Sequence, residues 1–318
     1  MKRTALAALA FVFGLSALAQ DGKTELRYGL KKGEKFSLSL SHALSVKLDK
    51  VPEILQGVVS EDPIAVKFEG VLDLEVTDIA DDGAARLNGT WRTAKAKGHI
   101  MVNDIDFDYD VAKKGDDKPK KKEEPEDPTL QGFGDLQDQL GKMVRTPLKL
   151  SADKLGKVTV VEGGDKLREI ESAFRSLNGL MGPLPKDAVA KGDSWKDELK
   201  LGMPGVGGTV DIKIRATNSI DAVEKLEGKD FYVIKSKFAV GKLPGEKDDA
   251  PAGDIQVKIK TEGEGEGKTL FSVSDGRASK SQSNLRVKVS ATIPNPGGGD
   301  DMDLKAKLTI DTSHSLGK

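Results

Sequence analysis

The feature that most constrains the fold of this chain is an alternation of apolar and polar residues with a period of two. In one run the apolar positions, separated mostly by serine, are Phe36, Leu38, Leu40, Leu44, Val46 and Leu48. Alternate residues of a β-strand point to opposite faces, so such a run has one dry face and one wet face. The same alternation recurs in residues 64–76, 210–214, 232–240, 255–259, 285–293 and 304–310. One-sided strands with short polar turns indicate antiparallel sheets.

Several of these runs are about twelve residues or longer, whereas a strand usually has about five or six. Long strands with a single apolar face favour a strongly curved sheet, because the apolar face must be covered by whatever the sheet encloses. The predicted fold is therefore mainly β: two tandem, related, curved antiparallel sheets, half-barrel-like, with one or two helices packed against them.

Two segments carry helical spacing instead. Residues 129–143 place apolar side chains at Leu130, Phe133, Leu136, Leu140 and Met143, and residues 165–180 carry the stripe Leu167, Ile170, Phe174, Leu177 and Met181. Asp165 is a suitable cap for the second helix, and Gly182 with Pro183 would end it. The stripe could serve a partner or a membrane surface, but a helix packed over a sheet is the favoured interpretation.

A pattern of Lys-Gly-acid-x-aromatic opens two of the strand runs, at Lys32–Phe36 and at Lys191–Trp195. In each copy we expect glycine to take a turn and the aromatic residue to hold the strand start in the core. Each copy precedes a long strand and then a strand pair, with turns at Asp82–Gly83 and Glu227–Lys229. We therefore predict an internal duplication.

The predicted organisation follows from these segments. A first β unit covers residues 20–163, a connecting helix covers 164–182, and a second β unit covers 183–318. Residues 113–128 read KKGDDKPKKKEEPEDP. Their charges balance and they cannot bury apolar surface, so they are expected to form a disordered charged loop within the first unit.

The stretch LRYGLKKG at Leu26–Gly33, with PLPK at Pro183–Lys186 running into Lys191–Trp195, resembles an uncharacterised family of exported bacterial proteins. That family is known only as a domain of unknown function, so the resemblance implies no activity, cofactor or catalytic residue. Long curved strands with a helix against them are also similar, in architecture alone, to the half-barrels of periplasmic lipoprotein carriers and related lipid-binding proteins.

Residues 1–19 have the parts of a secretory signal peptide: a basic start, an apolar run to Leu18 and the small residues Ala17 and Ala19. We predict an exported protein, periplasmic or extracellular, with an uncleaved N-terminal anchor as the alternative. The chain has no cysteine, which rules out disulfides and the cysteine-linked lipid of a lipoprotein. Removing Lys2 and Arg3 from the 50 basic residues leaves 48 against 51 acidic ones, a balance that argues against nucleic acid as a partner.

The sharpest enzymatic hypothesis is a serine esterase. Gly192–Trp195 is close to the Gly-Asp-Ser block of one hydrolase family, and Asp311 and His314 have the Asp-x-x-His spacing that orients its base. That family, however, carries its serine after a strand of a parallel α/β fold, with Gly and Asn blocks that are missing here. Ser194 is better explained by a turn entering a strand, so no enzymatic activity is expected.

Residues 262–269, EGEGEGKT, imitate a phosphate-binding loop. Glu262 stands where that loop needs glycine, and the glutamates would repel phosphate. The better interpretation is a strand with one glycine face, close to another backbone or a ligand.

Acidic and histidine side chains give no stronger metal signal. Asp104, Asp106, Asp108 and Asp110 could hold calcium, but Tyr109 and Gly115 break the calcium-loop pattern. The solvent-exposed face of a strand explains these aspartates better. Asp300, Asp301 and Asp303 are likewise not interpreted as a calcium site. His42, His99 and His314 lack zinc-site spacing. His42 and His314 occupy apolar positions of their strands, so each is expected to be partly buried and hydrogen-bonded.

No residue is therefore assigned a catalytic, cofactor-binding or metal-binding role, and no cofactor is expected. The leading functional prediction is a non-catalytic binding protein of the cell envelope that holds an apolar, lipid-like ligand or a protein partner, with no membrane span after signal cleavage. The alternative is a structural or interaction protein of the envelope without a small-molecule ligand. A serine esterase using Ser194 and His314 is the less favoured third hypothesis.

Overall fold

The computed structural model describes residues 22–52, 64–100, 103–112, 136–162, 184–205, 208–226, 228–241, 258–293 and 300–317. Its elements are β1 (Lys35–Lys50), β2 (Ile64–Ile79), β3 (Ala85–Ile100), β4 (Asn103–Asp110), α2 (Leu136–Arg145), β5 (Leu148–Ala152), β6 (Val158–Glu162), β7 (Ser194–Gly205), β8 (Gly208–Leu226), β9 (Lys229–Val240), β10 (Lys258–Ser272), β11 (Arg277–Ile293) and β12 (Met302–Gly317). The prediction of a mainly β, antiparallel protein with long strands is confirmed.

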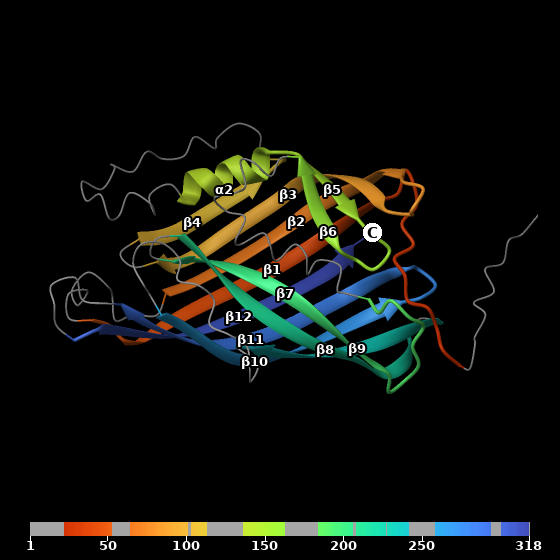
Figure 1. Ribbon diagram of the computed structural model, residues 1–318. Helices are drawn as coiled ribbons and strands as arrows, with labels where there is room; N and C mark the ends of the chain where they lie inside the picture. Colours follow the sequence, from red (N-terminus) through yellow and green to blue (C-terminus); the bar gives the residue numbers. More distant parts are fainter. Residues whose placement is uncertain are drawn as a thin grey trace, which may run out of the picture.

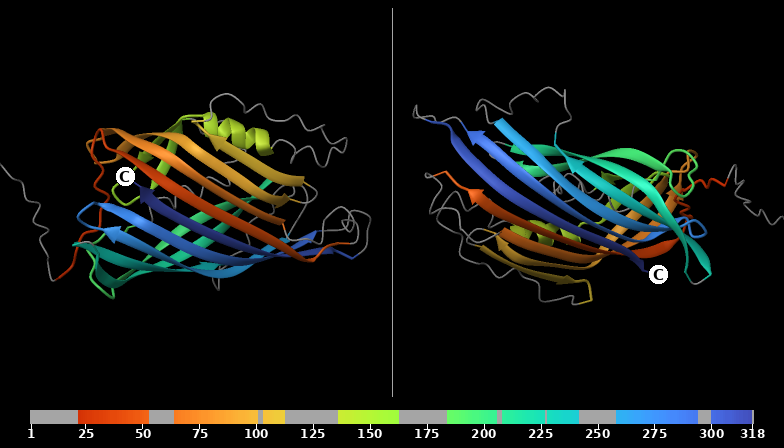
Figure 2. Two further views of the ribbon diagram at one scale, coloured as in Figure 1. Left: turned by 180° about the vertical axis from the view of Figure 1, so that it is seen from behind. Right: turned by 90° about the horizontal axis from the view of Figure 1, so that it is seen from below.

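All described strands belong to one antiparallel sheet of 12 strands, in the order β6-β5-β3-β2-β1-β12-β11-β10-β9-β8-β7, with β4 paired to β3. Figures 1 and 2 show this sheet curving so that β5 and β6 at one margin and β7 and β8 at the other turn toward the same side. We call the face enclosed by this curve the inner face and the opposite one the outer face.

The prediction of two separate tandem sheets is corrected by the pairing of the first strand with the last. β1 and β12 pair along most of their length, with Leu38 opposite Leu316, Leu44 opposite Ile310 and Val46 opposite Leu308. The apolar residues of both strands therefore lie on the same face at matching positions. The sequence alone predicts two strands, each with one apolar face. It does not predict that these two strands pair with each other in this register.

The helix prediction is met only in part. The segment expected at 129–143 contains α2, which packs on β3 and β4 through Leu140, Met143 and Val144. The expected helix at 165–180, the charged loop at 113–128 and the signal segment at 1–19 lie outside the described residues. No helix in the described part of the chain is long and apolar enough to cross a membrane.

The two Lys-Gly-acid turns have the same local structure. Gly33 and Gly192 both have positive φ, of 80° and 92°, as expected for glycine at a turn. Gly33 N–H donates to Val76 in β2, and Gly192 N–H donates to Ile220 in β8, both at 2.8 Å. The acidic residue of each pattern accepts a bond three residues back, from Lys31 or from Ala190. In both copies, the same sequence pattern thus hydrogen-bonds the turn before one strand to the next strand: the turn before β1 to β2, and the turn before β7 to β8.

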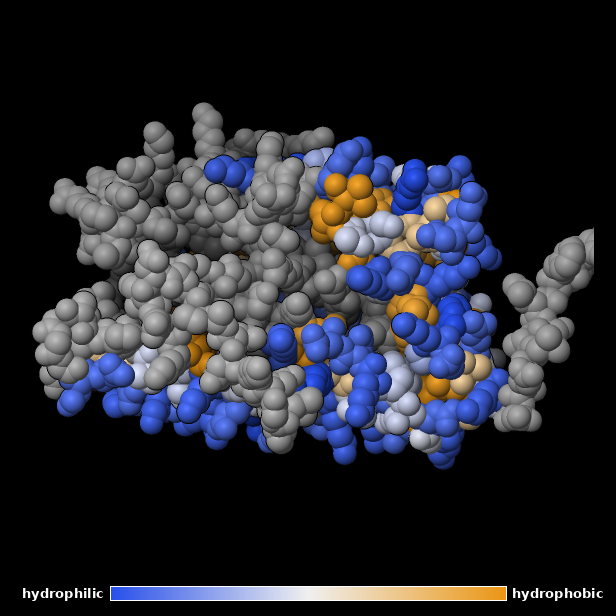
Figure 3. Space-filling view, viewed as in Figure 1, coloured by the Kyte–Doolittle hydropathy of each residue, from blue (hydrophilic) through white to orange (hydrophobic). Residues whose placement is uncertain are grey.

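Apolar side chains fill the inner face in three clusters. The largest lies over β1–β6 and α2 and includes Trp91, Leu72 and Met143. The second joins residues 26–28 and 184–189 to β8–β11, and the third lies over the far halves of β8, β9, β11 and β12. The outer face is charged instead, as at Glu262 opposite Lys288. Hydrophilic residues accordingly line the lower margin of Figure 3.

Residues 22–34 form a strap that ties together one end of the curved sheet. Thr24 pairs with Val189, Tyr28 N–H donates to Lys154, and Gly29 N–H donates to Gly276. Leu184 N–H also donates to Leu155 in the β5–β6 turn at 3.0 Å. Because Leu155 belongs to one margin of the sheet and Leu184 precedes β7 at the other, the two margins are joined at this end.

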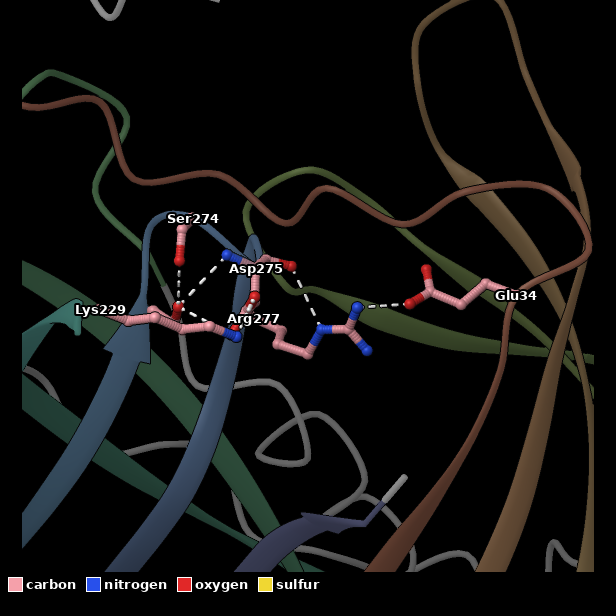
Figure 4. A network of polar contacts seen from close by, with 6 residues as sticks. Glu34, Lys229, Ser274, Asp275 and Arg277 are labelled. Carbon is pink, nitrogen blue, oxygen red and sulfur yellow. Dashed lines mark hydrogen bonds and ion pairs between the residues drawn. The ribbon is translucent and has the colours of Figure 1, made fainter. Parts of the chain in front are cut away.

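Polar contacts fix the strap onto the β10–β11 turn (Figure 4). Arg277 donates to the Glu34 carboxylate, and its Nε donates to the carbonyl of Asp275 at 3.2 Å. Lys229 reaches both carboxylate oxygens of Asp275, at 2.8 and 2.9 Å. The rings of Tyr28 in the strap and Phe271 in β10 meet edge to face, with centroids 5.4 Å apart. The turn therefore holds the strap by both charge and packing.

We expect Gly276→Ala to destabilise the protein by more than Gly228→Ala. Both glycines sit in turns with positive φ, of 58° and 78°, and alanine in this conformation costs about 1–2 kcal/mol. A Cβ at Gly228 meets open space, whereas one at Gly276 would lie 2.6 Å from the Gly29 nitrogen. Denaturant unfolding measures both variants. Equal losses would show that the strap does not press on this turn.

Candidate functional site: a polar band on the inner face

A band of polar side chains crosses the inner face between the apolar clusters. Its members come from six neighbouring strands and occupy positions of the apolar phase: His42, Asn218, Ser236, Thr269, Ser281, Ser283, Thr312 and His314. We call this set the polar band. Apolar residues precede and follow it along the strands, as β12 shows with Leu316 on one side and Ile310 on the other.

The strand register places the band members side by side. One row runs from His42 through Thr312 to Ser283, and then through Gly267 to Ser236 and Asn218. The next row runs from His314 through Ser281 to Thr269. Directly opposed residues in paired strands lie close enough for their side chains to interact. The band is therefore a continuous surface rather than a set of scattered polar residues.

Three hydrogen bonds link members of the band in pairs. Ser283 and Thr312 hydroxyls are 2.6 Å apart, and Thr269 and Ser281 hydroxyls are 2.9 Å apart. Ser236 donates to Asn218 Oδ1 at 2.6 Å. The band contains only serine, threonine, asparagine and histidine side chains, so histidine is its one residue type that could become charged.

Buried polar atoms in and beside the band lack hydrogen-bond partners among the described residues. They are Asn218 Nδ2, both ring nitrogens of His314, and the indole nitrogen of Trp195. Trp195 is the direct cross-strand neighbour of Asn218. Asn218 is only 1% exposed and His314 8%. An unpartnered buried donor or acceptor costs about 1–3 kcal/mol, so these groups would gain from a hydrogen-bonding occupant.

The two histidines of the band face each other across the seam between β1 and β12. Their ring centroids are 5.5 Å apart with a 58° angle between the ring planes. Burial, and to a smaller degree the neighbouring His42, lowers the pKa of His314 to about 4. Burial also lowers the pKa of His42. Both rings are therefore neutral at pH 7.

An apolar cavity lies between the largest cluster and the strap. It measures about 30 Å³ and lies between Tyr28, Phe36, Leu74, Leu150 and Leu316, with Arg277 at its polar side. This volume has room for a few water molecules, since one water needs about 10–15 Å³ of such space. The cavity is too small for the acyl chain of a lipid.

The structure does not assemble the residues of the esterase hypothesis. Ser194 is exposed on the outer face of β7, and His314 is buried on the inner face of β12. Four strands separate β7 from β12 in the sheet. Asp311 lies on the outer face, where Asn284 donates to it. His314, the base of that hypothesis, therefore does not lie beside Ser194.

The other sequence candidates lie on strand faces. Residues 262–269 belong to β10, with the glutamates outward and Gly263, Gly265 and Gly267 inward. A Cβ at Gly265 would lie 2.3 Å from the carbonyl oxygen of Asn284 in β11, so glycine here permits a close approach between two strands, as predicted.

The aspartates of β4 are exposed on its outer face. There Asp104 contacts His99 at 2.9 Å and Asp108 contacts Lys95 at 3.7 Å. Asp303 pairs with Lys50 at 3.1 Å and accepts from Thr292. Within the described residues no group of three His, Cys, Asp or Glu side chains could hold a metal ion.

Sequence reasoning noted that His42 and His314 fall on apolar positions but missed the rest of the band. The available signal was the interruption of each apolar phase by a small polar residue at a similar place, as with Ser281 and Ser283 before Leu285. Only the strand register shows that these interruptions align.

A scan of family models and a search of curated proteins found no match to this chain. Among solved structures, the chain is similar to OccK5 (OpdH) of Pseudomonas aeruginosa, with 8% sequence identity and a TM-score of 0.25. The alignment covers 90% of this chain and 99% of that one.

We expect the stability of the protein to fall as the pH is lowered from about 6.5 to 4. In this range unfolded histidine, with a pKa near 6.5, takes up a proton that folded His314 does not, so unfolding is favoured by up to about 3 kcal/mol. His314→Asn should flatten this part of the profile, measured by denaturant unfolding across pH. Equal profiles for His314→Asn and the wild type would contradict the prediction.

Proposed function

We propose that this chain is an exported, non-enzymatic binding protein of the cell envelope whose inner face holds its ligand or partner. The observation that carries the proposal is the set of buried, unpartnered polar atoms of Asn218, His314 and Trp195 on one face of one sheet. Buried polar groups are normally satisfied, so each exception calls for an explanation, such as a bound water, an ion or a functional role. Export rests on the signal-like residues 1–19, with a periplasmic or extracellular location.

The composition of the inner face favours an occupant that is both apolar and hydrogen-bonding. Asn218 and His314 are separated by four strand spacings, roughly 19 Å along the sheet. Between them lie hydroxyl groups, with apolar residues such as Phe238 and Leu285 beside them. A purely hydrocarbon ligand would leave the amide and imidazole groups unsatisfied. We therefore favour an uncharged, amphipathic molecule or peptide segment over a simple lipid chain.

Two further features are part of this proposal. The matching turns at Lys32–Phe36 and Lys191–Trp195 support an internal duplication, in which β1–β3 and β7–β9 are equivalent. The same segments support membership of the uncharacterised family of exported proteins that the sequence resembles. The alternative function, an envelope protein that engages partners without a small ligand, would use the same inner face or the strap.

Expression of the full chain in a bacterium with a general secretion system tests export. We expect the periplasmic or secreted product to begin at Gln20, because the small side chains of Ala17 and Ala19 fit the signal peptidase. Replacing Ala19 with a bulky residue should cause the precursor to accumulate. Intact mass and N-terminal sequencing measure both. A full-length product confined to the cytosol would contradict the proposal.

Native mass spectrometry of the purified protein tests ligand binding. We expect a co-purifying mass that disappears on denaturation and is reduced several-fold in Asn218→Ala. The matched control Asn88→Ala removes an exposed asparagine of β3 and should retain the ligand. Solvent extraction then identifies the released molecule. A protein free of ligand under every condition would favour the alternative of an interaction protein.

A further inference from the structure

The outer face carries a row of three lysines across the seam between β1 and β12. Lys47 of β1 is directly opposite Lys307 of β12, and Lys307 is directly opposite Lys288 of β11. All three side chains are exposed. Like charges at directly opposed positions destabilise the pairing of two strands. This row therefore lowers the stability of the seam rather than adding to it.

Such a row is unusual within this sheet. Lysines elsewhere on the outer face lie opposite acidic residues, as Lys35 does opposite Glu75, with a nitrogen–oxygen distance of 3.5 Å. Two lysines are also opposed elsewhere, as at Lys67 and Lys97. Among the described strands, however, no other three lysines are directly opposed in one row.

Further basic residues enlarge the row into a patch on three neighbouring strands. We call this set the basic patch: Lys47, Lys50, Arg286, Lys288, Lys305 and Lys307. The strand segments that carry it, residues 45–50, 286–292 and 303–309, contain six basic residues and two acidic ones, Asp49 and Asp303. These segments therefore have a formal charge of +4, although the chain as a whole has a net charge of −1.

Acidic neighbours compensate only half of the basic patch. Three of its members form ion pairs: Lys307 with Asp49 at 2.8 Å, Lys50 with Asp303 at 3.1 Å, and Lys288 with Glu262 of β10 at 3.4 Å. Glu264 of β10 and Asp300 and Asp301 before β12 border the patch. Within the described part of the chain Lys47, Arg286 and Lys305 have no ion pair. Their positive potential is available to an anionic partner.

The shape of the basic patch limits what that partner can be. Neighbouring strands are about 4.8 Å apart, and alternate residues of one strand are about 6.8 Å apart, so the patch covers roughly 10 Å by 14 Å of the sheet. Its side chains project from one face instead of converging on a point. This arrangement suits an extended anionic surface better than a single small anion.

An exposed apolar side chain lies at the same end of the sheet, remote from the strap. Ile259 at the start of β10 is 37% exposed, and the half-buried Leu48 and Leu304 belong to the same end of the inner face. At a bilayer surface the burial of apolar side chains and the attraction of basic ones to anionic lipids add together. A soluble acidic polymer would gain nothing from Ile259. The combination therefore favours lipid.

We propose that the basic patch, with Ile259 beside it, docks this protein on the surface of a bilayer that contains anionic lipids. The basic side chains lie among the lipid phosphates, whose negative charge offsets the repulsion between Lys47, Lys288 and Lys307. The docking is peripheral and reversible. It uses no residue of the polar band, so it is independent of the ligand proposed for the inner face.

Flotation of the purified protein with phosphatidylcholine vesicles, with or without phosphatidylglycerol, tests the proposal. We expect binding only to the vesicles that contain phosphatidylglycerol, and loss of this binding as salt screens the charges. The triple variant Lys47→Gln/Lys288→Gln/Lys307→Gln should bind at least about tenfold more weakly, because each lysine near an anionic membrane surface contributes a factor of about five.

A second triple variant provides a control with the same change in net charge. Lys235→Gln/Lys268→Gln/Lys280→Gln removes three exposed lysines from the outer face at the strap end and should bind nearly as the wild type does. Denaturant unfolding checks that the first variant folds. Since that variant loses the repulsion within the row, we expect it to be at least as stable as the wild type.

Soluble polyphosphate distinguishes a lipid surface from any other polyanion. Ile259→Ser should weaken binding to the anionic vesicles several-fold and leave any binding to polyphosphate unchanged. The proposal is overturned by equal losses in the two triple variants, by equal binding to vesicles without phosphatidylglycerol, or by vesicle binding that Ile259→Ser leaves unaltered.

Discussion

The pairing of the first strand with the last is the interaction on which the rest of this structure depends. β1 and β12 share one inner face and an aligned register. Without them in contact the sheet would divide into two parts, β6 to β1 and β12 to β7. Each part would then expose a long edge with unpaired backbone groups, which is a hazard for aggregation. The polar band also spans this seam, with His42 on one side and His314 on the other.

The inner face combines two opposing tendencies. Three apolar clusters stabilise the curve by burying side chains such as Trp91 and Phe271, each contributing about 1.5–3 kcal/mol. The polar band interrupts them and leaves atoms of Asn218 and His314 without partners in the described residues. A sheet selected for stability alone would carry apolar residues at these positions. The polar composition of the band is therefore the strongest reason to look for a binding role on the inner face.

Much of the fold could be predicted from the sequence because the apolar alternation is a local property. β1, β2, β9, β11 and β12 follow the predicted runs, and the Lys-Gly-acid turns have their expected geometry. The number of sheets depends instead on which strands pair across more than 250 residues, as Leu38 and Leu316 do, and periodicity does not encode that choice. The band was missed for the same reason, since Ser283 and Thr312 become neighbours only through the register. β3 was also hard to see, because Gly89 and Gly98 interrupt its apolar phase.

The strap has a consequence for the order in which the chain can fold. Residues 22–34 emerge from a ribosome or a secretion channel before the rest of the described chain, and their partners at Lys154, Val189 and Gly276 emerge much later. The closed end of the sheet can therefore form only after most of the chain is present, and β1 must wait still longer for β12. Such non-local pairing slows folding. The apolar side chains of the inner face are thus exposed to solvent until the late strands are added. During this period a chaperone that binds unfolded chains would find its largest apolar binding surface.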